Sequence, residues 1–286
     1  MSSSSSTPPT PTSLDQVAGW HDAYGVPHAA VVVAGPGGPL ARTGDVDLPL
    51  RLASVTKLLT AYAVLIGVEE GAVDLDDPAG PPGATVRHLL SHTAGYAFES
   101  GGGVIAQPGT RRIYSNRGIE ELAKHFATAS GIRFGDYLAE AVLEPLGLEH
   151  TELRGSPAHE GWSTADDVAT FATELLAPTL LAPETVKELV TVQFPGLSGV
   201  LPGIGRFDPL DWGLGPERNF GRPRHWAGER VPGTAFGHFG GSGTFLWADH
   251  QLSLATVCLT DRDFGDWALA AWPALCDAVV GEFGGR

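Results

Sequence analysis

Strand-like segments lie near both ends of this chain, and helical patterns fill most of the sequence between them. Ala29 to Ala34 is an apolar run rich in valine, and Pro39 to Thr43 can pair with it after a glycine-rich turn. Three further extended runs near the other end cover Thr234 to His238, Thr244 to Ala248 and Leu252 to Leu259. We therefore predict an α+β fold: an antiparallel sheet flanked by helices, built from both termini, with an inserted, mainly helical lobe.

The chain is long enough to form one large domain with two lobes. Its 286 residues are 43% apolar and can bury a large core. We expect residues 14–286 to form this domain, with a sheet lobe of residues 14–57 and 233–286 and a lobe of helices and loops over residues 58–232. Residues 1–13 are rich in Ser, Thr and Pro, which predicts a disordered tail.

The charge of the chain argues against a nucleic-acid partner. The net charge is −15, and the largest basic clusters are Arg111-Arg112 and Arg222-Pro223-Arg224. We expect a small molecule as the partner, and the sequence does not indicate an oligomeric state.

We also expect no membrane partner. The longest apolar run, Leu58 to Val68, has about half the length that a bilayer crossing needs, so it predicts a core helix. Residues 1–13 contain neither the positive nor the apolar region of a signal peptide, which predicts a cytoplasmic protein. Cys258 and Cys276 are interpreted as free thiols packed in the core.

Other helices are predicted from apolar residues at helical spacing and from helix-ending residues. They cover Leu14 to Tyr24, Leu58 to about Gly71, Thr85 to His92, the segment after Gly118 through Ala129, Gly131 to Leu143, Val168 to Leu176, and Asp266 to Phe283 with an interruption at Pro273. Ser163 and Asp166 have the spacing of a capping box, so Asp166 and Asp167 are interpreted as helix caps. Between Pro178 and Pro232 we expect long surface loops, with a short helix around Glu184 to Val192.

Ser54-Val55-Thr56-Lys57 stands where an extended segment turns into the apolar helix. A spacing of three places the Ser54 hydroxyl and the Lys57 amine on one face of that helix. A lysine whose pKa is lowered by apolar surroundings can take the proton from a serine hydroxyl and make it a nucleophile. The start of a helix also favours an oxyanion beside Ser54. The same four residues could equally be an ordinary helix start followed by a solvated lysine.

His88 and His92 are four residues apart on a predicted helix, a spacing that metal ligands use. Leu89 stands where the His-Glu-x-x-His pattern has its glutamate. We therefore interpret both histidines as makers of structural hydrogen bonds near Thr93 to Tyr96, and we expect no metal and no cofactor.

Three short motifs follow one another along the chain: Ser54-x-x-Lys57, Tyr114-Ser115-Asn116 and His238-Phe239-Gly240-Gly241. Their order and rough spacing resemble the serine β-lactamase and penicillin-binding-protein superfamily, and most closely the class C β-lactamase-related serine hydrolases, which include esterases and D-amino-acid peptidases. The resemblance runs from about residue 14 to the C-terminus. Other segments that look like this family are Leu75 to Pro78, Arg87 to Gly95, Pro145 to Leu148 and Ser163 to Val168.

The resemblance implies a β-lactamase/transpeptidase-like fold and acyl transfer. Ser54 would be the nucleophile, and Lys57 and Tyr114 would form the proton-relay pair. In this reading Lys57 is the cation that lowers the pKa of Tyr114. Positioned proton transfer of this kind contributes roughly 10²–10⁴ in rate.

The resemblance also implies residues that hold the substrate. Asn116 would orient Lys57 or a substrate amide, and the backbone amides of Ser54 and Gly241 would form the oxyanion hole. His238 and Gly240 would orient the substrate on an edge strand. In β-lactamases the sequence at this strand is Lys-Thr-Gly, so His238-Phe239-Gly240 weakens the recognition of a substrate carboxylate there.

The leading hypothesis is therefore a cytoplasmic serine hydrolase that acts on small esters or amides through an acyl-Ser54 intermediate. The stretch from Arg154 to Trp162 looks shorter than in the family, which indicates a trimmed helical lobe and a changed pocket. Together with the expected lack of a signal peptide, this argues against a periplasmic antibiotic-destroying role and against a cell-wall role. Two alternatives stay open: a D-aminopeptidase or weak β-lactamase, and a catalytically silent binding protein of the same fold. The physiological substrate is not indicated, because the pocket walls are expected in the loops between Pro178 and Pro232.

Overall fold

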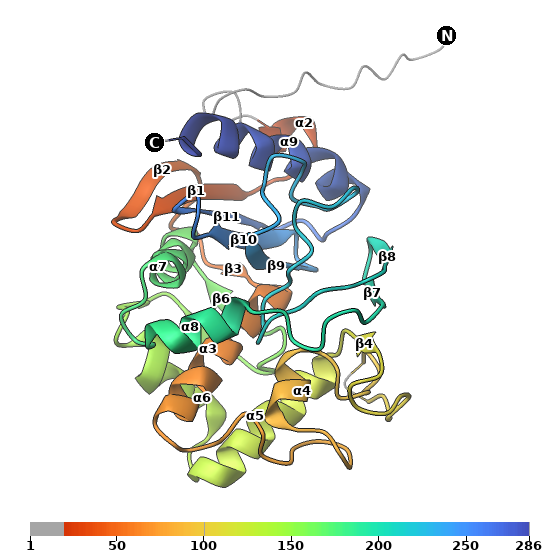
Figure 1. Ribbon diagram of the computed structural model, residues 1–286. Helices are drawn as coiled ribbons and strands as arrows, with labels where there is room; N and C mark the ends of the chain where they lie inside the picture. The colour runs from red at the N-terminus through yellow and green to blue at the C-terminus, as the bar shows by residue number, and fades with distance from the viewer. Residues whose placement is uncertain (1–19, 100, 286) are drawn as a thin grey trace.

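A five-stranded antiparallel sheet organises the upper half of the molecule in Figure 1. The computed structural model describes residues 20–99 and 101–285. The strands lie in the order β2-β1-β11-β10-β9. Their bounds are β1 Ala29–Gly35, β2 Gly38–Gly44, β9 Phe236–Gly240, β10 Thr244–Asp249 and β11 Leu254–Thr260. The sheet combines strands from both parts of the sequence, as predicted, and the α+β fold class is confirmed.

Helices cover both faces of this sheet. Helix α9 (Asp266–Phe283) lies above it in Figure 1, and α7 (Ala165–Leu176) packs against β1 and β11 from below. Successive side chains of a strand point to opposite faces, so Val32 joins the core shared with α7, whereas Val31 and its partner Cys258 join the core under α9. With both faces covered, every residue of β1 and β11 is buried.

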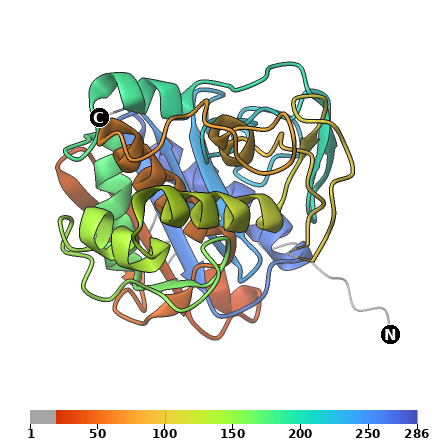
Figure 2. The same cartoon turned by 90° about the horizontal axis from the view of Figure 1, so that it is seen from below.

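The remaining elements are two small sheets, the short helix α2 (Trp20–Ala23) near α9 at the top of Figure 1, and the helices of the lower half of Figure 1, which stand in front of the large sheet in Figure 2. The small sheets contain β3 Leu50–Arg51, β5 Glu152–Leu153 and β6 Gly161–Ser163, and β4 Arg112–Ile113, β7 Gly199–Leu201 and β8 Gly205–Phe207. The helices are α2 Trp20–Ala23, the 3-10 turn η1 Ala53–Val55, α3 Thr56–Glu69, α4 Val86–Leu90, α5 Asn116–Ser130, α6 Phe134–Leu138, the π-helical turn η2 Ala139–Leu143, and α8 Pro183–Val190.

Helix α3 is the central helix of the molecule. Every residue from Thr56 to Gly67 is buried. A helix surrounded on all sides needs apolar residues all around it, which explains the unbroken apolar run and the absence of an amphipathic pattern. The predicted core helix after Ser54 is confirmed, and it has little freedom to move because protein packs against its whole circumference.

The cap of helix α7 differs from the prediction by one residue. Thr164, not Ser163, is the N-cap, and its hydroxyl accepts a hydrogen bond from the Asp167 amide at 3.2 Å. Ser163 ends strand β6, and its hydroxyl pairs with that of Thr151 at 2.7 Å. Asp167 accepts a hydrogen bond from the Thr151 hydroxyl at 2.9 Å, and Asp166 pairs with Arg42, so neither aspartate caps the helix with its side chain.

Helix α9 continues through Pro273, so the predicted interruption is wrong. Proline removes one N–H from the helical ladder. The apolar face of the helix, which includes the buried Trp272, Leu275 and Val279, outweighs that loss because most helical stability comes from tertiary packing. The helix predicted from Gly131 begins later, at Phe134, because Gly131 closes the preceding helix with φ +75°.

The segment from Pro178 to Pro232 is not simply a set of surface loops. It contains α8, β7 and β8, and it buries Trp212, Phe220 and Trp226 in the core under α9. Trp226 packs against Trp272 of α9, whereas Trp212 packs against Tyr114 and His238, and burying these large aromatic side chains compensates for the irregular backbone.

Several other predictions can be placed on this fold. Cys258 and Cys276 are buried and free, as predicted. Of the helix predicted over Leu14 to Tyr24, the described part is Trp20–Ala23, and the predicted tail over residues 1–13 lies outside the described residues. None of the helices within residues 20–99 and 101–285 is both long and apolar enough to cross a bilayer. The division into lobes at residues 57 and 233 stays a prediction.

Candidate active site

Ser54 lies at the start of the central helix, in the 3-10 turn that leads into α3. The preceding residue, Ala53, has φ +44°, a conformation that non-glycine residues rarely adopt and that is concentrated at functional sites. Neighbouring contacts hold this turn in place. Thr244 donates to the Leu52 carbonyl at 2.8 Å, and Ser242 donates to the Arg51 carbonyl at 2.6 Å. The sheet thus fixes the backbone just before the half-buried Ser54 side chain.

Gly240 lets the end of strand β9 approach this turn. A Cβ atom at position 240 would lie 2.4 Å from the Leu52 carbonyl oxygen and 3.1 Å from the Ala53 Cβ atom. Gly240 therefore acts on Ser54 through backbone packing, and it does not line the pocket described below.

The amine of Lys57 is fully buried and is surrounded by three oxygen atoms. Nζ lies 2.7 Å from Asn116 Oδ1, 2.7 Å from the Ala158 carbonyl oxygen and 3.1 Å from Ser54 Oγ. The two shorter contacts go to oxygens that can only accept, so Lys57 donates to both. The third goes to a hydroxyl, which can also donate. A neutral amine satisfies the whole arrangement if Ser54 donates its proton to the Nζ lone pair.

Burial favours this neutral form. It lowers the pKa of Lys57 well below the ordinary value, although Glu120 acts in the opposite direction. No salt bridge between described residues involves Lys57. The geometry is therefore that of a base beside a hydroxyl group.

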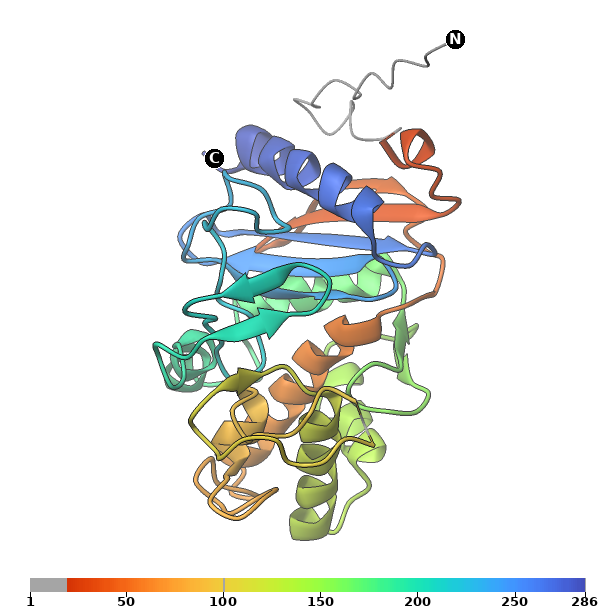
Figure 3. The same ribbon diagram turned by 90° about the vertical axis from the view of Figure 1, so that its right-hand side faces the viewer.

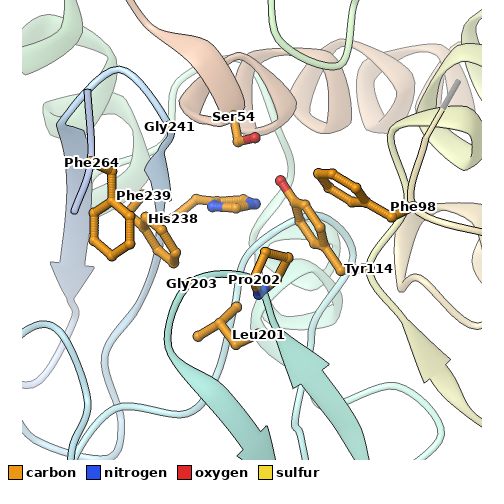
Figure 4. Close-up of a pocket in the computed structure, with 10 residues that line it drawn as sticks. All are labelled: Ser54, Phe98, Tyr114, Leu201, Pro202, Gly203, His238, Phe239, Gly241 and Phe264. Carbon is orange, nitrogen blue, oxygen red and sulfur yellow. The ribbon is translucent and has the colours of Figure 1, made fainter. Parts of the chain in front are cut away.

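Tyr114 follows strand β4 and brings its phenol ring beside Lys57, with Nζ 4.8 Å from the ring centroid. Its hydroxyl is buried and points toward Ser54 (Figure 4), although it forms no hydrogen bond within the described part of the chain. Burial raises the pKa of the Tyr114 hydroxyl above its ordinary value, and the Ser54 hydroxyl counteracts part of that rise. These directions oppose the prediction that a Lys57 cation produces a tyrosinate: they favour a neutral amine and a protonated phenol.

Asn116 begins helix α5, where the hydroxyl of the N-cap residue Ser115 accepts a hydrogen bond from the Gly118 amide at 3.0 Å. This cap fixes the start of the helix and so the Asn116 side chain, which accepts from Lys57. Of the two roles predicted for Asn116, the orientation of Lys57 is the one with a contact in the structure.

A pocket of about 200 Å³ opens beside Ser54 (Figure 4). Its wall is mostly apolar and is formed by residues that are far apart in the sequence. The lining residues are Ser54, Phe98, Tyr114, Leu201, Pro202, Gly203, His238, Phe239, Gly241 and Phe264. Ser54 and Gly241 lie on the same pocket, as an oxyanion hole formed by their backbone amides requires.

His238 lies on strand β9, with its ring 5.4 Å from that of Tyr114 in a T-shaped arrangement. Burial and the neighbouring Lys57 lower the pKa of His238 well below its ordinary value, so the ring is neutral. Neither ring nitrogen has a hydrogen-bond partner among the described residues, which leaves both free for a substrate or water.

The other two predicted histidine contacts are structural, but their partners differ from those expected. Nδ1 of His88 accepts from the Thr85 amide at 3.2 Å, and Nδ1 of His92 accepts from the Ser115 amide at 3.3 Å. His92 packs against Tyr114 with ring centroids 4.7 Å apart, so it supports the Tyr114 ring directly. Sequence reasoning did not assign it to the site.

Two further parts of the site were missed from the sequence. The Ala158 carbonyl is a backbone atom, and its contact with Lys57 carries no signal in the residue type. Phe98 lines the pocket because of tertiary packing, and no motif marks it. The Leu201–Gly203 segment of the wall lies between Pro178 and Pro232, where pocket walls were expected.

The beta-lactamase family model matches residues 14–276 of this chain. The crystal structure of a beta-lactamase from Mycobacterium bovis is 51% identical in sequence, with a TM-score of 0.90, and the match covers 94% of this chain and 98% of that one. A D-alanyl-D-alanine-carboxypeptidase/endopeptidase from Escherichia coli, AmpH, is 29% identical over 40% of this chain and 39% of its own length. ML-236A carboxylate methylbutanoyltransferase from Penicillium citrinum is 30% identical over 36% of this chain and 37% of its own length. The chain thus matches less than half the length of these two curated relatives.

Proposed function

The chain belongs to the beta-lactamase family, and on that premise we propose that it is a serine hydrolase that acts on small esters or amides through an acyl-Ser54 intermediate. The observation that carries the proposal is the contact between Ser54 Oγ and the buried amine of Lys57, whose two other partners can only accept hydrogen bonds. A serine hydroxyl beside a neutral, fixed amine is the arrangement that nucleophilic catalysis needs.

Acylation follows from this geometry. The Lys57 amine takes the proton of the Ser54 hydroxyl as Oγ forms a bond with the substrate carbonyl carbon. The backbone amides of Ser54 and Gly241 stabilise the negative charge that develops on the carbonyl oxygen, and one such donor contributes about 10²–10³ in rate. The protonated Tyr114 hydroxyl donates to the leaving oxygen or nitrogen as its bond to carbon breaks, and the Lys57 ammonium returns a proton to Tyr114.

Deacylation reverses these roles with water in place of the leaving group. The neutral Lys57 amine accepts a proton from water as the water oxygen attacks the ester carbon. Ser54 Oγ leaves and recovers its proton. The product acid is released, and both groups return to their starting protonation states.

The pocket beside Ser54 favours an apolar, uncharged portion of the substrate next to the reacting carbonyl group. Phe98, Leu201, Phe239 and Phe264 give it an apolar wall, and its volume is about 200 Å³. His238 is neutral, so the strand that carries a lysine in β-lactamases offers no cation here. Both features favour an ester or simple amide over a β-lactam.

Labelling and mass spectrometry test this proposal. A fluorophosphonate probe is expected to label the wild-type protein and not the Ser54→Ala variant, and intact mass after brief exposure to a p-nitrophenyl ester is expected to show one added acyl group. Equal labelling of the wild-type protein and the Ser54→Ala variant would contradict the proposal. Turnover of the p-nitrophenyl ester, nitrocefin and a D-alanine p-nitroanilide then ranks esterase, β-lactamase and D-aminopeptidase activity.

The acyl acceptor is a separate question, because one curated relative is a methylbutanoyltransferase. We propose water as the acceptor, and adding an alcohol to the ester assay tests this. A constant rate of acid release supports hydrolysis, whereas an alcohol ester that replaces the acid as the main product indicates a transferase.

A further inference from the structure

A second pocket adjoins the one beside Ser54 and shares Phe98, Tyr114 and Pro202 with it. Its volume is about 250 Å³. The remaining wall comes from the sheet of β4, β7 and β8, which stands toward the viewer in Figure 3. A substrate whose carbonyl group lies at Ser54 can therefore extend into this second pocket without leaving the protein surface.

The register of this small sheet places two arginines on one face. Ile113 pairs with Val200, and Val200 pairs with Arg206, so these three side chains share a face. Arg111 stands two residues before Ile113 and also lines this pocket. The exposed face of the sheet thus carries an apolar centre with an arginine at each side.

The apolar centre is unusually open to solvent. The exposed fractions of Ile105, Val200 and Phe98 are 63%, 57% and 39%, and all three line the second pocket. Large apolar side chains gathered in this way mark a binding surface more often than isolated ones do.

The charge of the second pocket is opposite to that of the chain. The protein has 33 acidic and 18 basic residues, yet three arginines and no acidic residue line this pocket. Arg111 and Arg206 are exposed and take part in no salt bridge between described residues. Arg206 donates one hydrogen bond, to the Ser198 hydroxyl at 3.1 Å.

Arg112, the third arginine of the second pocket, has a different role from Arg111 and Arg206. It is buried, and its guanidinium donates only to backbone carbonyls, those of Ser91, Gln193, Phe194 and Leu210. It holds the wall in place and adds positive charge behind it, whereas Arg111 and Arg206 keep donors free for a ligand.

We infer that the second pocket binds the far end of the substrate, and that this end is an apolar chain or ring that carries an anionic oxygen group, a carboxylate or a phosphate. The inference rests on the proposed function, since it extends the substrate from Ser54. Arginine recognises both groups through paired N–H donors, and the apolar centre accommodates the chain between them and the carbonyl. The anionic end of the substrate thus binds at the arginines of the second pocket and not at strand β9, where His238 and Phe239 provide no cation.

Matched esters test the inference. One is the mono-p-nitrophenyl ester of a dicarboxylic acid, and the other has the same chain with its far end capped as a methyl ester. The wild-type protein is expected to prefer the acid-ended ester in kcat/KM by roughly three- to tenfold, an effect of the size of charge-assisted contacts at a partly exposed site. The preference should shrink as salt is added.

The double variant Arg111→Gln/Arg206→Gln is expected to bring the ratio of the two kcat/KM values to about one, while Arg133→Gln, which removes an exposed arginine outside both pockets, should keep the wild-type ratio. An unchanged ratio in the double variant, or a wild-type preference for the capped ester, overturns the inference and leaves the proposed function standing. Absence of an acyl-enzyme with either ester would instead remove the proposed function. An ester of the same length with a terminal phosphate monoester identifies which of the two anionic groups is preferred.

Discussion

Lys57 and Tyr114 divide the acid and base roles through opposite pKa shifts. Burial lowers the pKa of the amine and raises that of the phenol, so one group is a base and the other an acid in the same pH range. Burial thereby produces a pair that can move a proton, and no salt bridge among the described residues involves Lys57.

The pH dependence of ester hydrolysis follows from these directions. The base acts when it is neutral, and the neutral fraction rises as pH rises through the pKa of Lys57, which is lowered well below 10.5. The acid acts when protonated, and its raised pKa keeps Tyr114 protonated beyond 10.0. We expect kcat/KM to rise with pH in one ionisation well below the ordinary lysine value and then to stay level to about pH 10.

Measured kcat/KM between about pH 5 and pH 10 checks this expectation. The variant His238→Asn is the control, since the His238 ring lines the pocket and is the histidine that could act as a base in place of Lys57. If the ionisation disappears in this variant, the histidine and not the lysine is the base. An ionisation near 10.5 in the wild-type protein would also contradict the assignment.

Side chains that stand in short linear motifs were predictable, and contacts made by the fold were not. Ser54 and Lys57 lie three residues apart on one helix, so their proximity follows from helical geometry. The Ala158 carbonyl reaches Lys57 across 101 residues of sequence, and its position depends on how that loop packs. Even for predicted residues, the protonation states depend on burial, which the sequence does not show.

Strand β9 packs closely against the turn at Ser54, and the contact lies at Gly240. The sheet and the long helices were predictable because their periodic or β-branched patterns are local. The close approach of β9 to the turn was not, since it depends on atoms of Leu52 and Ala53 about 190 residues earlier.

Gly240→Ala tests this contact. The added Cβ atom would lie 2.4 Å from the Leu52 carbonyl oxygen, so the strand or the turn must shift. We expect a loss of about 1–3 kcal/mol in the free energy of unfolding, as in overpacked cores. We also expect a fall of roughly 10- to 100-fold in kcat/KM, because the nucleophile is displaced.

Gly241→Ala is the matched control for stability. A Cβ atom there has no neighbour within 4 Å, and neither position has a positive φ. Thermal unfolding should therefore separate the two variants. Equal melting temperatures for Gly240→Ala and the wild-type protein would show that the contact relaxes without cost.

At the scale of the whole molecule, the segment from Pro178 to Pro232 packs along the edge of the large sheet. The Glu217 amide donates to the Gly237 carbonyl of β9 at 2.8 Å, which covers the outer edge of the strand that carries His238. The buried Glu217 carboxyl group accepts from His225, Asn219 and Trp226 at 3.0, 3.2 and 3.1 Å. The Glu217 side chain thus holds Asn219, His225 and Trp226 together, and its backbone joins them to the sheet.

Removing that carboxyl group is expected to affect the entire protein. Glu217→Ala leaves three buried donors without their acceptor, and we expect it to lower the free energy of unfolding by about 3–5 kcal/mol. Asp136→Ala, which removes a carboxylate from the exposed pair with Arg133, should cost less than about 1 kcal/mol. Urea denaturation of both variants provides the measurement. If the two losses are equal, the docking of this segment on the sheet does not depend on the buried Glu217 network.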